Sequence, residues 1–177
     1  MSTPRFVGFA GSFGATSKTR ALVAEAAGQA AGRFGGTSEV FDLLDLGDEF
    51  GRERRLGDLT PAARVHVDAL LSADAIVVGS PVYKGSYSGL FKHFIDLLDP
   101  MDLVGKPVLL VAAGGGDRHA LMIEHQMRPL FGFFEARVLA TGVYASAGDF
   151  TDGKPTAAPL LARLERAVGQ FAPYLPE

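Results

Sequence analysis

The sequence predicts an α/β protein with a doubly wound parallel β-sheet, and three features support this prediction. First, five short β-rich runs alternate with five helical patterns along the chain. Second, the runs 75–79 and 108–113 are apolar almost without interruption, as expected for strands covered by helices on both faces. Third, the 177 residues are 47% hydrophobic and lack a linker rich in Pro, Gly or Ser, so we expect residues 1–177 to form one domain.

The expected elements alternate regularly. The β-rich runs lie near residues 5–10, 38–43, 74–79, 107–113 and 137–144. The segments with helical periodicity lie near residues 19–32, 60–72, 87–98, 119–134 and 157–172. In doubly wound sheets, ligands bind beyond the carboxyl ends of the strands, so the loops after the first, third and fourth strands are the candidates for a binding site.

A turn rich in hydroxyl groups follows the first strand and leads into an Ala-rich segment that begins at Arg20. The N–H groups at a helix start carry partial positive charge, and hydroxyls can donate to phosphate oxygens. The hydroxyl groups of this turn belong to Ser12, Thr16, Ser17 and Thr19. They favour one terminal phosphate, as in FMN; an ordinary turn with a helix cap is the alternative.

Two better-known phosphate loops are absent from this turn. The glycines fall at positions 8, 11 and 14, which does not match the dinucleotide pattern G-x-G-x-x-G. Before Lys18-Thr19, Ser12 and Ser17 stand where the nucleotide-triphosphate loop requires glycines. The turn therefore favours a mononucleotide over NAD or ATP as the bound group.

The loop after the third strand, residues 79–89, combines a proline and three glycines with two tyrosines. Proline and glycine define a tight backbone, and the rings of Tyr83 and Tyr87 offer flat surfaces. Such a loop can hold a planar ring. The alternative is a plain connection in which the tyrosines pack against the next helix.

The loop after the fourth strand contains Gly114, Gly115 and Gly116 in succession. Glycines let a ligand lie against bare backbone, and their amides can bond to the carbonyls and nitrogens of a ring. A flavin requires such donors, because they tune how readily its ring accepts a hydride.

Composition and charge exclude several classes of function. The net charge is −3 with Lys and Arg dispersed, so we expect neither nucleic acid nor a membrane surface as a partner. The apolar runs are too short to span a bilayer, and the first residues do not resemble a signal peptide, so a cytoplasmic location is expected. The sequence has no cysteine, so electron chemistry would require an organic cofactor.

The histidines do not predict a metal site. His119 and His125 are six residues apart on one predicted helix, so at 100° per residue they point about 120° away from each other. The sequence has no H-E-x-x-H pattern. We therefore expect no bound metal.

The three loops, with the segment 87–98, resemble the NAD(P)H-dependent FMN reductases of flavodoxin-like fold. The matching segments are Gly11-Ser12 with Ser17 and Thr19, Ser80-Pro81-Val82-Tyr83-Lys84, Tyr87-Ser88-Gly89-Leu90-Phe91-Lys92, Asp96-Leu97-Leu98 and Ala113-Gly114-Gly115. They are most similar to reductase components of two-component alkanesulfonate and methanesulfonate monooxygenase systems. The resemblance implies a flavodoxin-like five-stranded parallel sheet in the order 2-1-3-4-5, with helices on both faces.

The resemblance also implies an NAD(P)H:FMN oxidoreductase, with NADPH preferred over NADH, that passes FMNH2 to a separate monooxygenase. Its implied FMN-binding residues are Ser12, Ser17, Lys18 and Thr19 at the phosphate, Pro81, Val82, Tyr83 and Lys84 along the ring, and Gly114, Gly115 and Gly116 at the pyrimidine end. No catalytic acid or base is implied, because hydride passes directly from the nicotinamide to the flavin.

Two other functions are compatible with the same loops. One is an NAD(P)H-dependent enzyme that keeps FMN tightly bound and reduces a quinone, azo compound or chromate. The other is a flavodoxin-type electron carrier with no substrate of its own. Carriers are typically strongly acidic, and a net charge of −3 argues against this class.

Two predicted helical segments carry more apolar side chains than one face of a sheet requires. They are residues 87–98 and the stretch 129–134. Excess apolar surface on such helices is typical of subunit contacts. We therefore expect a homodimer or homotetramer joined through helix 87–98 and the loop before it.

The resemblance draws attention to His125. In the similar alkanesulfonate reductases the corresponding helix carries an extra tyrosine, accommodated as a π-bulge at a tetramer interface beside the flavin. An ungapped alignment from Gly114 to Pro129 places His125 at that position. We expect a helix irregularity near His125 at a subunit contact, with flavin exchange rather than hydride transfer depending on it. A regular helix with His125 in ordinary packing is the alternative.

Overall fold

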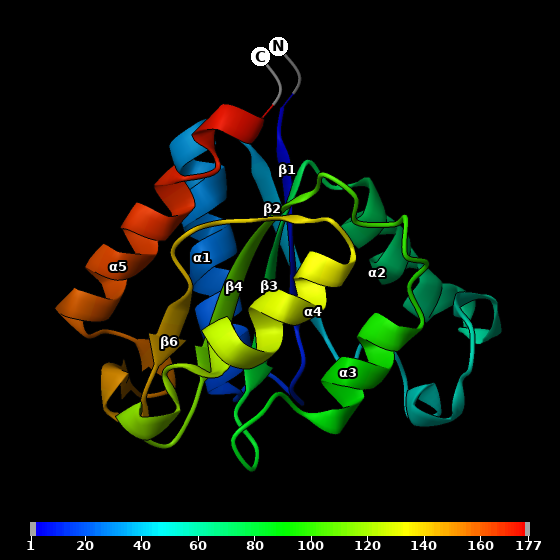
Figure 1. Cartoon of the computed structure of the whole chain (residues 1–177), viewed down its shortest axis with the longest axis horizontal. Coiled ribbons are helices and arrows are strands. Elements are labelled where there is room, and N and C mark those ends of the chain that lie inside the picture. Colours follow the sequence, from blue (N-terminus) through cyan, green and yellow to red (C-terminus); the bar gives the residue numbers. More distant parts are fainter. Residues whose placement is uncertain (1–2, 176–177) are drawn as a thin grey trace.

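The computed structural model describes residues 3–175 and contains a parallel sheet with helices on both faces (Figure 1). Its strands are β1 (Arg5–Ala10), β2 (Thr37–Asp42), β3 (Ala75–Pro81), β4 (Pro107–Ala113), β5 (Arg137–Val138) and β6 (Val143–Ala145). The order is β2-β1-β3-β4-β5, with β6 also paired to β4, and all pairings are parallel. The predicted order 2-1-3-4-5 is confirmed.

The helices divide between the two faces of the sheet. They are α1 (Lys18–Phe34), α2 (Pro61–Ser72), α3 (Gly89–Asp96), α4 (Arg128–Phe133) and α5 (Ala158–Gly169). Figure 1 shows α1 and α5 on one side and α2, α3 and α4 on the other, and each group has its own buried apolar cluster. Among residues 3–175, every helix falls short of the length and apolar character that crossing a bilayer requires.

Short elements complete the described chain. Single 3₁₀ turns lie at Phe50–Arg52, Leu56–Asp58, Asp117–His119, Ala147–Asp149 and Ala172–Tyr174. The strands β7 (Phe150–Thr151) and β8 (Lys154–Pro155) form a small antiparallel hairpin before α5. The first residue of the turn at Ala147–Asp149 reaches the edge of the sheet at which the predicted loops meet.

Two glycines allow α1 to pack closely against the centre of the sheet. A Cβ added at Gly8 would lie 2.6 Å from a Val23 methyl carbon, and one added at Gly79 would lie 2.4 Å from the other Val23 methyl carbon. Any larger residue at these strand positions would push the helix away. The N-terminus of α1 is thereby held close to the carboxyl ends of β1 and β3.

The expected fifth strand, residues 137–144, is divided into β5 and β6. Between β5 and β6, arginine side chains donate to backbone carbonyls that would otherwise accept hydrogen bonds from a neighbouring strand. Arg128 donates to the carbonyls of Leu139 (2.9 Å) and Ala140 (3.2 Å), and Arg163 donates to that of Gly142 (2.9 Å). The chain can leave the sheet here because these contacts satisfy its polar groups.

The expected helix 119–134 is also interrupted. A π-helical turn spans Ile123–Met127, and the Arg128 N–H bonds to the Ile123 carbonyl, five residues back. Pro129 follows and has no N–H to give the His125 carbonyl its α-helical bond. The irregularity expected near His125 is therefore present, and the regular helix is wrong.

The reason for expecting a subunit contact at residues 87–98 does not hold. In α3, Phe91 and Phe94 are fully buried within the chain. The Phe94 ring lies 4.2 Å from that of Phe9 and 6.4 Å from that of Phe50, between ring centroids. The loop that carries Phe50 covers the side of α3 that the sheet leaves free. Among the exposed apolar side chains, Leu121 and Phe133 are 63% and 67% exposed and lie before and after the π-helical turn.

Candidate flavin site

A pocket of about 390 Å³ lies at the carboxyl edge of the sheet, within the size range of small-molecule sites. It is lined by Ser12, Phe13, Ser17, Lys18, Thr19, Pro81, Val82, Tyr83, Ala113, Gly114, Gly115 and Ala147. The loops after β1, β3 and β4 therefore meet as the sequence predicts. Of the predicted residues, Lys84 and Gly116 are outside this lining.

The turn after β1 directs hydroxyl groups and a helix N-terminus toward the pocket. Ser12 and Thr19 are buried, and the Ser17 hydroxyl donates to that of Ser12 over 2.7 Å. Ser17 also accepts the Arg20 N–H at 3.3 Å and so caps α1. The first turn of α1 contains no acidic side chain, so its partial positive charge is not neutralised there. This arrangement suits an anion.

A buried carboxylate accepts a backbone hydrogen bond from this turn. Asp42, at the end of β2, is 2% exposed and accepts the Gly14 N–H at 3.1 Å and the Leu44 N–H at 2.8 Å. Gly14 has a φ of 82°, which favours glycine. Asp42 is not predictable from a motif, because its role depends on strand order.

The loop after β3 is fixed to the turn after β1 by buried serines. The Ser88 N–H donates to the Ser80 hydroxyl at 3.1 Å, and the Ser88 hydroxyl donates to the Gly11 carbonyl at 2.9 Å. Ser88 also caps α3 by accepting the Phe91 N–H. Two of the three loops that form the pocket are therefore linked through one side chain.

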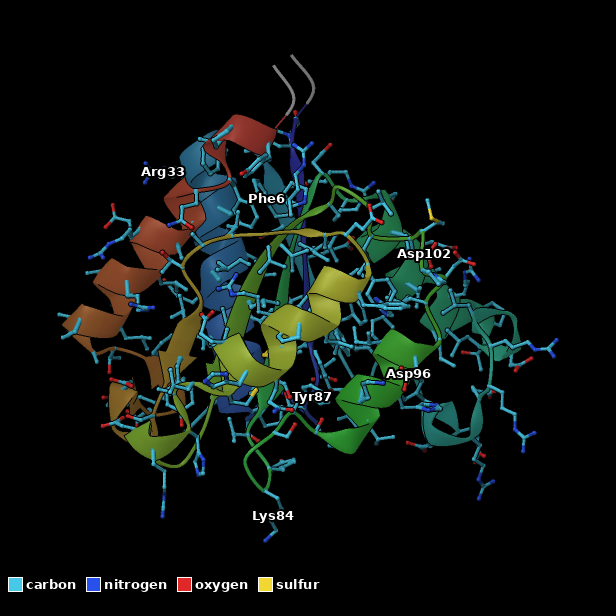
Figure 2. The ribbon with its side chains drawn as sticks, in the orientation of Figure 1. Phe6, Arg33, Lys84, Tyr87, Asp96 and Asp102 are labelled. Atoms are coloured by element: carbon cyan, nitrogen blue, oxygen red, sulfur yellow. The ribbon has the colours of Figure 1, made fainter. Side chains whose placement is uncertain are left out.

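A two-residue hairpin turn forms the outer part of the loop after β3. The backbones of Tyr83 and Ser86 bond to each other, and the two residues between them, Lys84 and Gly85, have φ values of 53° and 84°. Tyr83 lines the pocket although it is 59% exposed. Lys84 lies at the tip and points away from the body of the protein (Figure 2). Tyr87 packs against Phe91, as in the alternative for this loop.

The loop after β4 places Gly114 and Gly115 in the pocket lining. The carbonyl of Gly116 accepts the hydroxyl of Tyr144, a β6 residue, at 2.6 Å. Burial raises the pKa of Tyr144, as does the charge of Asp117, so the hydroxyl keeps its proton at neutral pH. The glycine loop thus faces the pocket while a tyrosine holds its far end.

Three lining residues were not predicted. Phe13 and Ala113 are immediate neighbours of predicted residues, so treating each loop as a continuous segment would have included them. Ala147 comes from the segment after β6, where no motif indicated a ligand. Within residues 3–175, no group of three or more His, Cys, Asp or Glu could hold a metal ion.

Comparisons with known proteins agree with this geometry. A sequence model of the family described as NADPH-dependent FMN reductase matches residues 4–151. The chain is 39% identical over 174 residues to NADH-dependent FMN reductase SfnF of Pseudomonas fluorescens (strain Pf0-1), covering 98% of this chain and 93% of the relative. It is 44% identical over 136 residues to an FMN reductase (NADPH) of Pseudomonas aeruginosa, covering 77% and 73%.

Solved structures give the same result for the fold. A crystal structure of the apo form of an NADH:FMN oxidoreductase (EmoB) superposes with a TM-score of 0.86 and 28% identity, covering 99% of this chain and 91% of that one. Oxidised flavodoxin 1 of Bacillus cereus superposes with a TM-score of 0.63 at 16% identity. The flavodoxin-like fold is therefore confirmed.

Proposed function

The chain belongs to the NADPH-dependent FMN reductase family and is an NAD(P)H:FMN oxidoreductase, and we propose that it delivers reduced FMN to a separate monooxygenase. The observation that carries the FMN-binding part of this proposal is that the turn after β1, the loop after β3 and the glycine loop after β4 converge on one pocket. The pocket joins an anion-binding end to a wall suited to a flat ring, which are the two requirements of FMN.

We infer the following roles for the lining residues. Ser12, Ser17 and Thr19 donate to the FMN phosphate beside the N-terminus of α1, and Lys18 adds a positive charge. The ring lies along Pro81, Val82 and Tyr83, with its pyrimidine end at Gly114 and Gly115. FMN supplies the hydride-accepting chemistry, so the protein needs only to bind and orient the two rings.

Exposed aromatic rings at the mouth of the pocket support binding of a second planar ring, the nicotinamide, beside the flavin. Phe13 is 53% exposed and Tyr83 is 59% exposed, although both line the pocket. Exposed aromatic rings at a mouth can contact an incoming ring at little entropic cost. A preference for NADPH stays a prediction, because the relatives' names include both NADH and NADPH.

A homo-oligomer is part of the proposal. Leu121 and Phe133 are exposed on either side of the π-helical turn. Large apolar side chains in this arrangement favour a subunit contact there rather than at α3. Light scattering at micromolar concentration should give a dimer or tetramer mass, and a monomer mass would contradict this part of the proposal.

A tightly bound FMN that reduces a quinone or azo compound is the second candidate. One relative, an FMN-dependent NADPH-azoreductase of Staphylococcus aureus, is 31% identical over 83 residues, which is 45% of this chain. The match is shorter than those to the FMN reductases. The proposal therefore gives priority to free FMN as the substrate.

The test is steady-state oxidation of NADPH and NADH with free FMN or a quinone as acceptor. We expect the rate to saturate with free FMN and to need no quinone. After anaerobic reduction, reduced flavin should pass an ultrafiltration membrane that retains the protein. Flavin retained with the protein, together with quinone-dependent turnover, would favour the second candidate; binding without turnover would favour a carrier.

A further inference from the structure

Tyr144 contacts the glycine loop without lining the flavin pocket. Its side chain borders a second cavity of about 380 Å³, together with residues that include Asp117, Glu124 and Gly142. Gly114 lines the flavin pocket, and a Cβ built on it would meet the Tyr144 hydroxyl. The glycine loop therefore lies between the flavin pocket and a second cavity. Tyr144 borders the second cavity, which has no role in the proposed reaction.

The hydroxyl of Tyr144 adds a side-chain hydrogen bond to a segment whose backbone is bonded at Gly114, which donates to the Ala145 carbonyl at 2.9 Å, and at Gly116, which accepts the His119 N–H at 3.5 Å. It donates to the Gly116 carbonyl over 2.6 Å. Among the side-chain hydrogen bonds of residues 3–175, this is the one that reaches the three glycines. Three successive glycines have more conformational freedom than any other tripeptide, so one short bond restricts them substantially.

The three glycines differ in what their missing side chains allow. A Cβ at Gly114 would lie 2.2 Å from the Tyr144 hydroxyl oxygen and 3.1 Å from the ring carbon that bears it. A Cβ at Gly115 or Gly116 would have no neighbour within 4 Å. Gly114 is thus required to admit Tyr144, in addition to its predicted role of letting a ligand approach the backbone.

We propose that Tyr144 is a positioning residue that holds the loop Gly114–Gly116 in the conformation that binds the ring of the flavin. The proposal rests on the proposed function, because it assumes that FMN occupies the pocket. The hydroxyl acts only as a hydrogen-bond donor to the backbone. Its effect is on binding of the ring and not on hydride transfer itself.

The test is Tyr144→Phe, which removes the hydroxyl and keeps the ring. We expect the Kd values of FMN and of riboflavin to rise by the same factor, about 2- to 10-fold, because the lost bond acts at the ring and not at the phosphate. The KM for FMN should rise by that factor while kcat stays unchanged. Tyr174→Phe is the matched control, since Tyr174 is exposed and packs on Arg137 rather than on the pocket, and it should change none of these values.

A double-mutant cycle separates this role from general damage. Gly114→Ala should weaken riboflavin binding strongly in the wild-type background and less in Tyr144→Phe, because the closest contact of the new methyl group is the hydroxyl. Gly115→Ala should show no such coupling. Additive effects at Gly114 and Tyr144, or an unchanged riboflavin Kd in Tyr144→Phe, would overturn the inference while leaving the proposed function intact. A wild-type protein that binds neither flavin would overturn both.

Discussion

Arg20, in the first turn of α1, and Asp42, at the end of β2, form an ion pair with 3.1 Å between Nη1 and Oδ2. The Asp42 side chain is 3% exposed and the Arg20 side chain 28%. Asp42 also accepts the N–H of Gly14, in the candidate phosphate turn, and that of Leu44, in the loop after β2. The pair therefore connects β2 to the turn, and Arg20 neutralises a carboxylate that would otherwise repel a bound phosphate.

Replacing Arg20 with Ala should leave the Asp42 charge buried without its cationic partner. We expect the free energy of unfolding to fall by about 1–3 kcal/mol and FMN binding to weaken. Urea unfolding of the apoprotein and fluorescence titration with FMN measure the two effects. Arg52→Ala removes a shorter but exposed pair with Glu49, at 2.8 Å, and it should change stability by less than about 0.5 kcal/mol. Equal effects of the two substitutions would contradict this reading of the pair.

Ser17→Ala should weaken FMN binding by about tenfold or more and leave riboflavin binding nearly unchanged, because only FMN has a phosphate. The substitution also removes the cap of α1, at a cost of about 1 kcal/mol. Thr60→Ala removes the cap of α2 at a similar cost and provides the control, since Thr60 is outside the pocket. If both variants lose FMN affinity, or neither does, Ser17 does not bind the phosphate.

Phe94→Ala should destabilise the protein by about 3–5 kcal/mol, because the ring is fully buried among other aromatic rings. Val65→Ala shortens a side chain on α2 that is 66% exposed, and it should cost less than about 0.5 kcal/mol. Urea unfolding monitored by circular dichroism compares the two. A small loss in Phe94→Ala would mean that this side chain is not part of the core.

The pair Glu124–Arg128 should make stability depend on pH. The hydrogen bond from Arg128 lowers the pKa of Glu124 below its usual 4.5. A carboxylate with a lowered pKa stabilises the folded state at neutral pH, and this contribution disappears as pH falls through the lowered value. Glu124→Gln should therefore be less stable than the wild type at pH 7, by under about 1 kcal/mol because the pair is partly exposed. The difference should shrink below pH 4.5; a difference independent of pH would refute the assignment.

His125→Ala should change the rate at which FMN dissociates while leaving the rate of hydride transfer at saturating FMN unchanged. His125 lies on the exposed side of the π-helical turn, whose neighbour Gln126 is 3.3 Å from the Ser86 hydroxyl of the Tyr83 loop. Stopped-flow measurements of both rates test the prediction, with Glu165→Ala on α5 as a distant control. Unchanged dissociation would show that exchange does not depend on His125.

The sheet and most of the pocket could be predicted because their signals are local. Continuous apolar runs identify β3 and β4, and the carboxyl ends of neighbouring parallel strands must meet at one edge. The hydroxyl turn and the glycine loop follow two such strands directly. Their convergence therefore needs no knowledge of side-chain packing.

The features that could not be predicted depend on contacts between distant parts of the chain. The division of the fifth strand requires Arg128 and Arg163, which lie on different helices. The burial of Phe94 requires Phe50, from a loop with no periodicity. The position of Lys84 outside the pocket, by contrast, could have been predicted from the sequence. Lys84-Gly85 between Tyr83 and Ser86 is compatible with a two-residue hairpin turn, which directs Lys84 outward.

The place of β1 between β2 and β3 has a consequence for synthesis on the ribosome. The first strand to be made is a central one, and β3 is completed only at Pro81. At the usual rates of elongation, roughly 4–14 s separate the synthesis of the two strands. During that interval the apolar side chains of β1, including Phe6 and Phe9, have no β3 to pair with. Nascent chains of this protein should therefore depend on chaperones more than chains whose first strand is at an edge.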